Sequence, residues 1–361
     1  MIYLDYQATT PLAPEAREAM ITWLGGPDSE TFGNPHSPHR MGRMAAAAVE
    51  VAREQVAKLF PPGGQVIFTG SATEAINLAI RGNMPVRSGE HLAFSAIEHA
   101  AVIDTVKAIG NWSELPVGPD GVIAPDVEMP KYVGLMCVMQ VNNEIGTIQP
   151  IAGMATRAKE TGALLLVDGV QAAGKMALPQ QADMIAVSAH KLHGPKGIGA
   201  LWVRDGLSLI PYVEGGGQEQ GLRSGTLSPA LCAGFGAAAA LAVARQEEDA
   251  AHVEDLWHIA RDAFSGWTLN GSEEQRWHGN LNVRKDGLDV ARLMSECREV
   301  MFSAGSACAS GSGRTSHVLR AIGLSDAQAK SSIRLGWGCY TTREDMQRAC
   351  SIILEAADSQ A

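Results

Sequence analysis

The sequence lacks the features that mark secreted proteins, membrane-spanning proteins and proteins stabilised by a bound metal ion. Its six cysteines form no CxxC pair and show no metal-ligand spacing. Residues 1–17 contain neither the basic segment nor the apolar segment of a secretion signal. The longest apolar run, residues 230–244, is shorter than the roughly 20 residues that span a bilayer. We therefore expect reduced thiols, a cytoplasmic location and no membrane contact.

Positive charge is also scarce. The chain has 29 Lys and Arg against 39 Asp and Glu, a formal net charge of −10, and it has no long basic run. This balance argues against nucleic acid as a partner. Hydrophobic residues, in contrast, make up 46% of the 361 positions, enough to bury a large core in about two domains.

Two short apolar runs within residues 164–199 each stop at a side chain that can do chemistry. The first run ends at Asp168, and the second at Lys191. Runs of this length, joined by a helix-sized segment, are typical of neighbouring parallel strands buried on both faces. Ligands bind beyond the carboxyl ends of such strands, so we expect both side chains to meet one small molecule.

An amine at this position favours Schiff-base chemistry with a carbonyl group. Pyridoxal phosphate needs such a lysine together with an acid for its ring nitrogen, and Asp168 could be that acid. The simpler alternative is that Asp168 caps a turn and Lys191 is solvated. The small and polar residues crowded around Lys191, among them Ser188, His190 and His193, argue against that alternative.

A third feature is the segment Q-V-I-F-T-G-S-A-T-E-A-I-N-L, which predicts a strand, a turn and a helix. The turn would place the free backbone N–H groups of Ala72 and Thr73 at a helix start, where an anion binds. A structural alternative is that Thr73 only caps the helix.

The segments V-D-G-V-Q and S-A-H-K-L-H-G-P-K-G-I-G-A-L resemble the cofactor site of cysteine desulfurases of the NifS/IscS type, with further matches from Tyr3 to about Thr342. These are class V aminotransferase-like, fold-type I pyridoxal-phosphate enzymes. The resemblance implies an α/β fold with a mostly parallel central sheet flanked by helices. The change near residue 245 from an apolar helix to charged sequence predicts a boundary there, with a large cofactor-binding domain at residues 15–245 and a smaller α+β domain at residues 1–14 and 246–361.

The resemblance also implies roles for individual residues. Lys191 would hold pyridoxal 5'-phosphate, and Lys191, His99 and Cys308 would be catalytic. The further cofactor contacts would be Asp168, Gln171, Asn143, Ala72, Thr73, Ser188, His190 and Thr226, and the substrate contacts would be Asn34, Arg223 and Arg334. Thr226 and Arg223 would reach a partner subunit, which implies a homodimer. One departure is Gly70-Ser71, where the family usually has Ser-Gly.

Cys308 lies in S-A-G-S-A-C-A-S-G-S-G-R, a stretch with few side chains to pack. We expect a mobile loop over about residues 303–314, and the resemblance makes Cys308 the sulfur acceptor. The function implied is conversion of L-cysteine to L-alanine, with sulfur passing to an enzyme persulfide and then to an acceptor protein, such as an iron–sulfur scaffold or a thiolation partner. Alternatives are a selenocysteine lyase, another class V aminotransferase or lyase, and a non-catalytic scaffold. No metal is expected.

Overall fold

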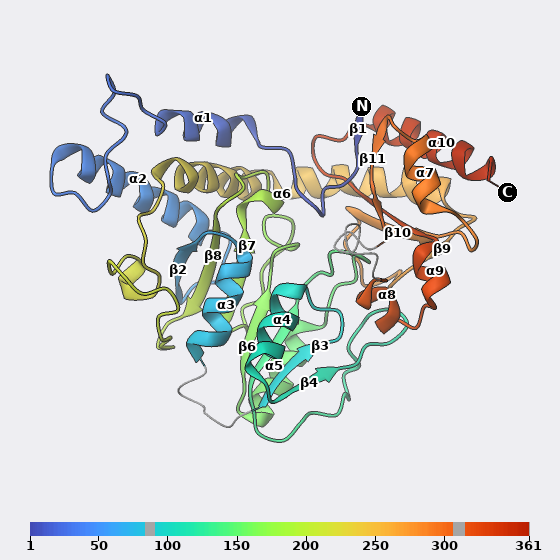
Figure 1. Cartoon of the computed structure of the whole chain (residues 1–361), viewed down its shortest axis with the longest axis horizontal. Coiled ribbons are helices and arrows are strands. Elements are labelled where there is room, and N and C mark those ends of the chain that lie inside the picture. Colours follow the sequence, from blue (N-terminus) through green and yellow to red (C-terminus); the bar gives the residue numbers. More distant parts are fainter. Residues whose placement is uncertain (84–90, 306–314, 361) are drawn as a thin grey trace.

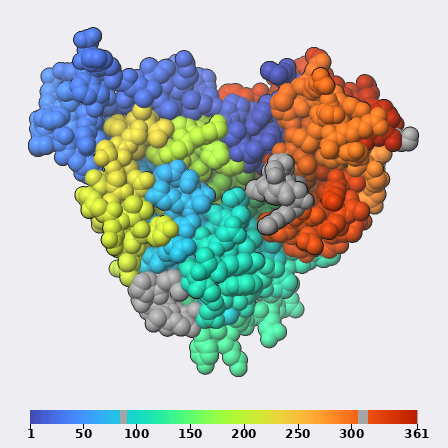
Figure 2. All heavy atoms as spheres, viewed as in Figure 1, coloured from blue at the N-terminus to red at the C-terminus, as the bar shows by residue number. Residues whose placement is uncertain are grey.

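The computed structural model describes residues 1–83, 91–305 and 315–360. The chain forms two lobes joined by one long helix, with both termini in the smaller lobe (Figure 1). The space-filling view shows the C-terminal residues as a separate mass beside the larger lobe (Figure 2). No helix in the described ranges is both long and apolar enough to cross a bilayer.

A seven-stranded sheet forms the centre of the large lobe, in the order β2-β8-β7-β6-β5-β3-β4. Strand β8 runs antiparallel to both of its neighbours, and the other adjacent pairs are parallel. The predicted mostly parallel sheet is therefore confirmed. Its strands are β2 (Gly64–Thr69), β3 (His91–Ser95), β4 (Trp112–Leu115), β5 (Val133–Met139), β6 (Leu164–Asp168), β7 (Met184–Ser188) and β8 (Gly199–Arg204).

Helices cover both faces of this sheet, which is why its central strands are apolar throughout. All seven residues of β5 and all five of β7 are buried. Side chains alternate along each strand, so that Val66 and Phe68 face one core and Ile67 faces the other. The first core also holds α1 (Pro14–Thr22), α2 (Arg40–Ala57), α5 (Ile151–Thr161) and the start of α6 (Pro229–Ala263), and the second holds α3 (Ala72–Asn83) and α4 (Ala100–Ile109).

The small lobe has its own antiparallel sheet, in the order β12-β13-β10-β9, and its own hydrophobic core. The N-terminal strand pairs with this lobe through β1 and β11. The strands are β1 (Ile2–Tyr3), β9 (Thr268–Leu269), β10 (Asn280–Arg284), β11 (Val300–Met301), β12 (Ser303–Ala304) and β13 (Ser332–Gly336). The helices are α7 (Val290–Glu296), α8 (His317–Ala321), α9 (Asp326–Lys330) and α10 (Arg343–Asp358).

Helix α6 runs through residue 245 without a break, although the sequence changes there from apolar to charged. The charged part stays helical because strong helix formers follow and Arg245 pairs with Asp249 one turn later, at 3.2 Å. Phe235 packs in the first core of the large lobe, whereas Leu256 packs in the core of the small lobe. The division at residue 245 thus remains a prediction, with distinct cores on either side of it.

Two features of the fold bear on the predicted loop at residues 303–314. Ser303–Ala304 form β12 against β13, so the described start of this segment is a strand. Cys308 lies outside the described residues. Its predicted role is neither supported nor contradicted by the structure.

Gly199 lets strand β8 pass close to the turn between β2 and α3. A Cβ atom at this position would lie 2.6 Å from the carbonyl carbon of Ser71 and 2.7 Å from the amide nitrogen of Ala72. Because both atoms are backbone, neither can rotate away. A side chain here would therefore push the turn out of place.

We expect Gly199→Ala to lower the free energy of unfolding by about 1 to 3 kcal/mol, the usual cost of overpacking. Gly153→Ala is the matched control, because its Cβ would meet nothing within 4 Å on an exposed part of α5; it should raise stability by up to about 1 kcal/mol. Urea unfolding followed by circular dichroism checks both. Equal midpoints for the two variants would contradict the close approach.

Candidate active site

A cavity of about 360 Å³ lies beyond the carboxyl ends of the parallel strands, between the sheet and Arg334 of the small lobe. Ten of the residues predicted from the sequence line it together: Ala72, Thr73, His99, Asn143, Asp168, Gln171, Ser188, His190, Lys191 and Arg334. They come from the ends of neighbouring strands, from the start of α3 and from β13, as the strand-end argument predicts.

Asp168 and Lys191 end or follow adjacent parallel strands. Asp168 is the last residue of β6 and pairs with Ala186 in β7, while Lys191 closes the 3₁₀ turn Ala189–Lys191 directly after β7. The amine of Lys191 donates hydrogen bonds to the backbone oxygens of Ala8, at 2.7 Å, and Gln7. The N-terminal segment thus holds the predicted reactive amine at the cavity.

Burial controls the charge of Asp168. The side chain is buried and its Oδ1 accepts a hydrogen bond from Val170 N at 2.9 Å. Loss of solvation raises its pKa, and the nearby His99 and Lys191 oppose that rise. A positive charge in the cavity would lower the pKa further. The site therefore favours a cationic ring atom beside this carboxyl group.

His99 is held in one tautomer by the helix that follows it. Its Nδ1 accepts a hydrogen bond from Ala101 N at 3.1 Å, as the N-cap of α4. Since an amide can donate only to an unprotonated nitrogen, the neutral ring carries its proton on Nε2. Burial lowers the pKa of His99, which keeps the ring neutral. His99 thus offers an N–H group at Nε2. For Nε2 to accept a proton instead, the ring proton would have to sit on Nδ1, which would break the hydrogen bond from Ala101 N.

The turn before α3 is capped by Ser71 rather than by Thr73. Ser71 Oγ accepts a hydrogen bond from Glu74 N at 3.2 Å, and Ser71 O accepts from Ala75 N at 3.1 Å. This arrangement leaves the first-turn amides of Ala72 and Thr73, at the cavity wall, for an anion. The change from Ser-Gly to Gly-Ser moves the capping hydroxyl to position 71.

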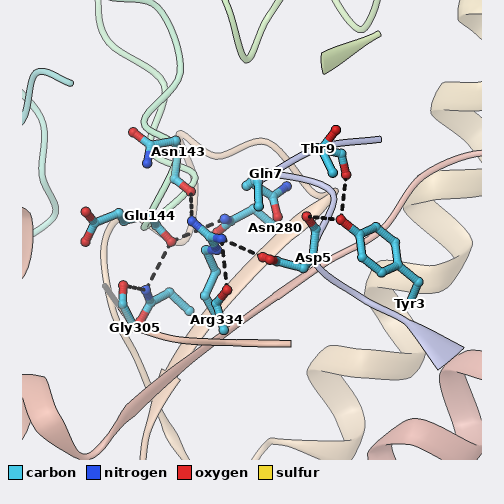
Figure 3. Close-up of polar contacts among 12 residues, drawn as sticks. Tyr3, Asp5, Gln7, Thr9, Asn143, Glu144, Asn280, Gly305 and Arg334 are labelled. Atoms are coloured by element: carbon cyan, nitrogen blue, oxygen red, sulfur yellow. Dashed lines mark hydrogen bonds and ion pairs between the residues drawn. The ribbon is translucent and has the colours of Figure 1, made fainter. Parts of the chain in front are cut away.

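Arg334 is almost fully buried, with 1% of its surface exposed. Its Nη2 donates to Asp5 Oδ1 at 2.6 Å and its Nη1 to Asn143 O at 3.1 Å, as Figure 3 shows. Gln7 and Tyr3 lie in the same group of polar residues, on the N-terminal segment. These two contacts, with a longer one from Nη2 to Ser303 Oγ at 3.4 Å, hold the guanidinium rigidly at the edge of the cavity, which suits recognition of a carboxylate.

Gln171 and His190 also contact the N-terminal segment. Gln171 Nε2 donates to Gln7 O at 3.1 Å, and the ring of His190 lies 3.1 Å from Thr9 Oγ1. Gln171 Oε1 accepts from the buried amine of Lys175 at 3.4 Å, and burial lowers the pKa of Lys175 to about 7. Ser188 is buried at the end of β7. These contacts fix the cavity wall on the side of Lys191.

Three predicted residues lie apart from the cavity lining. Asn34 is exposed and accepts a hydrogen bond from His36 N at 2.9 Å. Thr226 is also exposed. Arg223 forms an ion pair with Glu74, 2.6 Å between Nε and Oε1. Their predicted contacts with substrate or with a partner subunit stay predictions.

Four residues of the site or its support have roles that the sequence does not predict: Asp5, Gln7 and Ala8, and Ser71 as the cap of α3. Asp5 and Gln7 stand in I-Y-L-D-Y-Q, where polar residues interrupt a short strand-like run. That interruption was the available signal. Their partners Arg334 and Lys191 lie far along the chain, so no local pattern could have named the pairing. Within the described part of the chain, no group of three or more His, Cys, Asp or Glu side chains is placed to hold a metal.

The fold and the site define a class V aminotransferase. Residues 2–349 match the family described as Aminotransferase class-V. The chain is 38% identical to a protein named cysteine desulfurase IscS of Rickettsia bellii (strain OSU 85-389), covering 98% of this chain and 90% of the relative. It therefore belongs to this family, which uses pyridoxal 5'-phosphate.

Solved structures agree with this assignment. A structure titled NIFS-LIKE PROTEIN has a TM-score of 0.89 at 30% identity and covers 99% of both chains. A structure titled SspA in complex with cysteine has a TM-score of 0.81 at 33% identity, covering 95% of this chain and 100% of the other. The predicted resemblance and fold class are confirmed.

Two histidines beside the site predict how stability depends on pH. Burial lowers the pKa of His190 and of His193 to about 4, from an unfolded value of 6.5. As the pH falls from about 6.5 to 4, the unfolded chain binds protons that the folded chain does not. The free energy of unfolding should therefore fall, by up to about 1.4 kcal/mol per pH unit for each ring before solvent screening.

His193→Asn should remove the contribution of one ring to this fall in the free energy of unfolding. The difference in free energy of unfolding between wild type and variant should therefore shrink as the pH falls. His36→Asn, at an exposed position, is the control and should give a gap that stays constant. Urea unfolding at several pH values from 4 to 7.5 measures both gaps. Parallel curves for wild type and His193→Asn would show that burial does not hold this ring neutral.

Proposed function

We propose that the chain is a pyridoxal-phosphate-dependent cysteine desulfurase, which converts L-cysteine to L-alanine and transfers the sulfur to an enzyme persulfide and then to an acceptor. The observation that carries the proposal is the single cavity that joins the amine of Lys191, the buried carboxyl group of Asp168 and the first-turn amides of α3. Relatives with this activity in their names match almost the whole chain.

The residues present fit pyridoxal 5'-phosphate. A lysine amine for its aldehyde, a buried acid for its ring nitrogen and backbone donors for its phosphate all line one cavity. Gly199 keeps the Ser71–Ala72 peptide close to β8, in a space that any Cβ would fill. When bound, the cofactor supplies an electron-withdrawing ring that stabilises negative charge on the substrate carbon.

The chain's own groups do the remaining work. Lys191 would hold the cofactor, and once substrate has taken its place its amine would move protons at the substrate carbon. Asp168 stays ionised beside a ring cation, since that charge offsets the cost of burying the carboxylate. His99 offers its Nε2–H to the reacting group, in the tautomer that Ala101 N fixes.

Arg334 would bind the substrate carboxylate. The three contacts that fix its guanidinium, to Asp5, Asn143 O and Ser303, leave further N–H groups of the planar fork. Nε of Arg334 is buried without a hydrogen-bond partner among the described residues. A rigid cation at the cavity wall with donors to spare favours a carboxylate as its partner.

Cys308 would accept the sulfur. Its thiolate attacks the substrate sulfur; an S–S bond forms, the carbon–sulfur bond of cysteine breaks, and the carbon takes a proton. The products are alanine and the Cys308 persulfide, so atoms and electrons balance without an oxidant. A homodimer and a transient sulfur-acceptor protein complete the proposal.

The test is an assay of purified protein with L-cysteine. Cys308→Ser should retain cofactor absorbance but make almost no alanine or persulfide, because a hydroxyl cannot take the sulfur. Buried Cys232→Ser and Cys350→Ser are controls at packing positions and should keep turnover once folded. Mass spectrometry after brief cysteine treatment should find added sulfur on the peptide with Cys308. Sulfur on Cys339 instead would overturn the role of Cys308.

A second prediction concerns Arg334→Lys. We expect the KM for cysteine to rise roughly ten- to hundredfold, because losing a charge-assisted bidentate contact costs about 1.5 to 3 kcal/mol. Lysine keeps a positive charge beside Asp5 and so limits the structural damage. Arg284→Lys is the control, since Arg284 lies on the same small sheet and pairs with Asp286 at 2.8 Å outside the cavity lining. An unchanged KM in Arg334→Lys would remove this residue from substrate binding.

A further inference from the structure

Glu74 places a carboxylate one residue beyond the cavity wall at Thr73. Its Oε2 accepts a hydrogen bond from Gly70 N at 2.7 Å, on the other side of the turn before α3. The same carboxylate pairs with Arg223, whose Nε lies 2.6 Å from Oε1 and whose Nη2 lies 3.3 Å from Oε2. Arg223 comes from the glycine-rich loop after β8, far along the chain.

This carboxylate binds Gly70 N in the same turn whose Ala72 and Thr73 amides the proposed function assigns to the cofactor phosphate. A phosphate monoester carries about −1.5 to −2 charges at neutral pH, so an ionised Glu74 beside it would repel it. Glu74 and Arg223 are each only about one-fifth exposed, at 22% and 20%, and water screens such a charge incompletely. A fixed cation on Glu74 removes most of this repulsion.

The loop that carries Arg223 is anchored by a second ion pair. Glu219, with 3% of its side chain exposed, binds Arg53 through two contacts of 2.7 Å and accepts from Phe68 N in β2 at 2.6 Å. Glu219 and Gln220 have φ of 48° and 57°, a left-handed conformation that costs free energy in residues other than glycine. The partly buried Arg53–Glu219 pair offsets that cost and fixes where Arg223 can reach.

We infer that Arg223 and Glu74 are positioning residues for the cofactor phosphate: Glu74 shapes the turn by binding Gly70 N, and Arg223 cancels the charge that this leaves beside the phosphate. This inference rests on the proposed function. It gives Arg223 a role inside its own subunit. The resemblance, in contrast, places Arg223 near a substrate entrance, and the two roles predict different measurements.

A double-mutant cycle that removes the charges of Arg223 and Glu74 distinguishes these two roles. Arg223→Gln should weaken binding of pyridoxal 5'-phosphate to the apoenzyme by roughly tenfold, since it exposes the phosphate to an unpaired carboxylate. Glu74→Gln should bind at least as tightly as wild type, because its amide oxygen still accepts from Gly70 N. The double variant Arg223→Gln/Glu74→Gln should recover wild-type affinity. Arg223→Lys, which keeps the charge, should stay within a few-fold of wild type.

Absorbance titration of the cofactor measures these affinities, and unfolding of the apoenzyme checks that each variant folds. Arg157→Gln, which breaks a pair with Glu160 in α5, is the matched control and should bind normally. Full affinity in Arg223→Gln, a defect that Glu74→Gln fails to rescue, or a tenfold loss in Glu74→Gln alone would each overturn the inference. So would a rise in the KM for cysteine with unchanged cofactor affinity.

Borohydride reduction of wild-type protein with cofactor, followed by peptide mapping, distinguishes failure of the inference about Arg223 and Glu74 from failure of the proposed function. Reduced cofactor attached to Lys191 would support the proposed function, whatever affinities the Arg223 and Glu74 variants show. Absence of label removes the function itself, and the inference with it.

Discussion

The site depends on one N-terminal segment, residues 2–13, which is hydrogen-bonded to both lobes. Towards the small lobe, Leu4 N donates to Met301 O at 2.8 Å and Gly336 N donates to Leu4 O at 2.8 Å. Towards the large lobe, Thr10 N donates to His190 O at 2.9 Å. Between these anchors, backbone oxygens hold the Lys191 amine and a carboxylate holds Arg334. The amine and the guanidinium come from different lobes, and this segment is what places them around one cavity.

Much of the site could be predicted from the sequence because several of its residues follow short apolar runs, which are typical of buried parallel strands. Asp168 and Lys191 were found in this way, and the resemblance to a family supplied roles that no local pattern contains. Pairings between distant residues could not be found. Arg334 and Asp5 are 329 positions apart, and Arg223 and Glu74 are 149 apart. Each side chain alone looks like an ordinary surface charge, and only the fold brings its partner to it.

Burial shifts the pKa values of the acidic groups in this site more than any single charged neighbour does. Glu98 is fully buried directly before His99; burial, and then the charge of Asp168, raise its pKa well above the usual range. Its Oε1 accepts from Met139 N at 2.6 Å, which opposes that rise. Two carboxyl groups cannot both stay charged in such surroundings. Glu98 is therefore the neutral acid of the two, and this leaves the negative charge to Asp168, where a ring cation can stabilise it.

The relation between the lobes limits how the site can change. A rigid helix of 35 residues, α6, contributes to the cores of both lobes, and buried polar contacts join them on the other side of the cavity. Glu144, in the loop after β5, accepts from Ser316 Oγ at 2.5 Å, and its backbone oxygen accepts from Asn282 Nδ2 at 3.0 Å. Opening the lobes would break these hydrogen bonds, at a net cost of about 0.5 to 1.5 kcal/mol for each. The contacts between the lobes therefore favour the arrangement in which Arg334 and Lys191 already face one cavity before substrate binds.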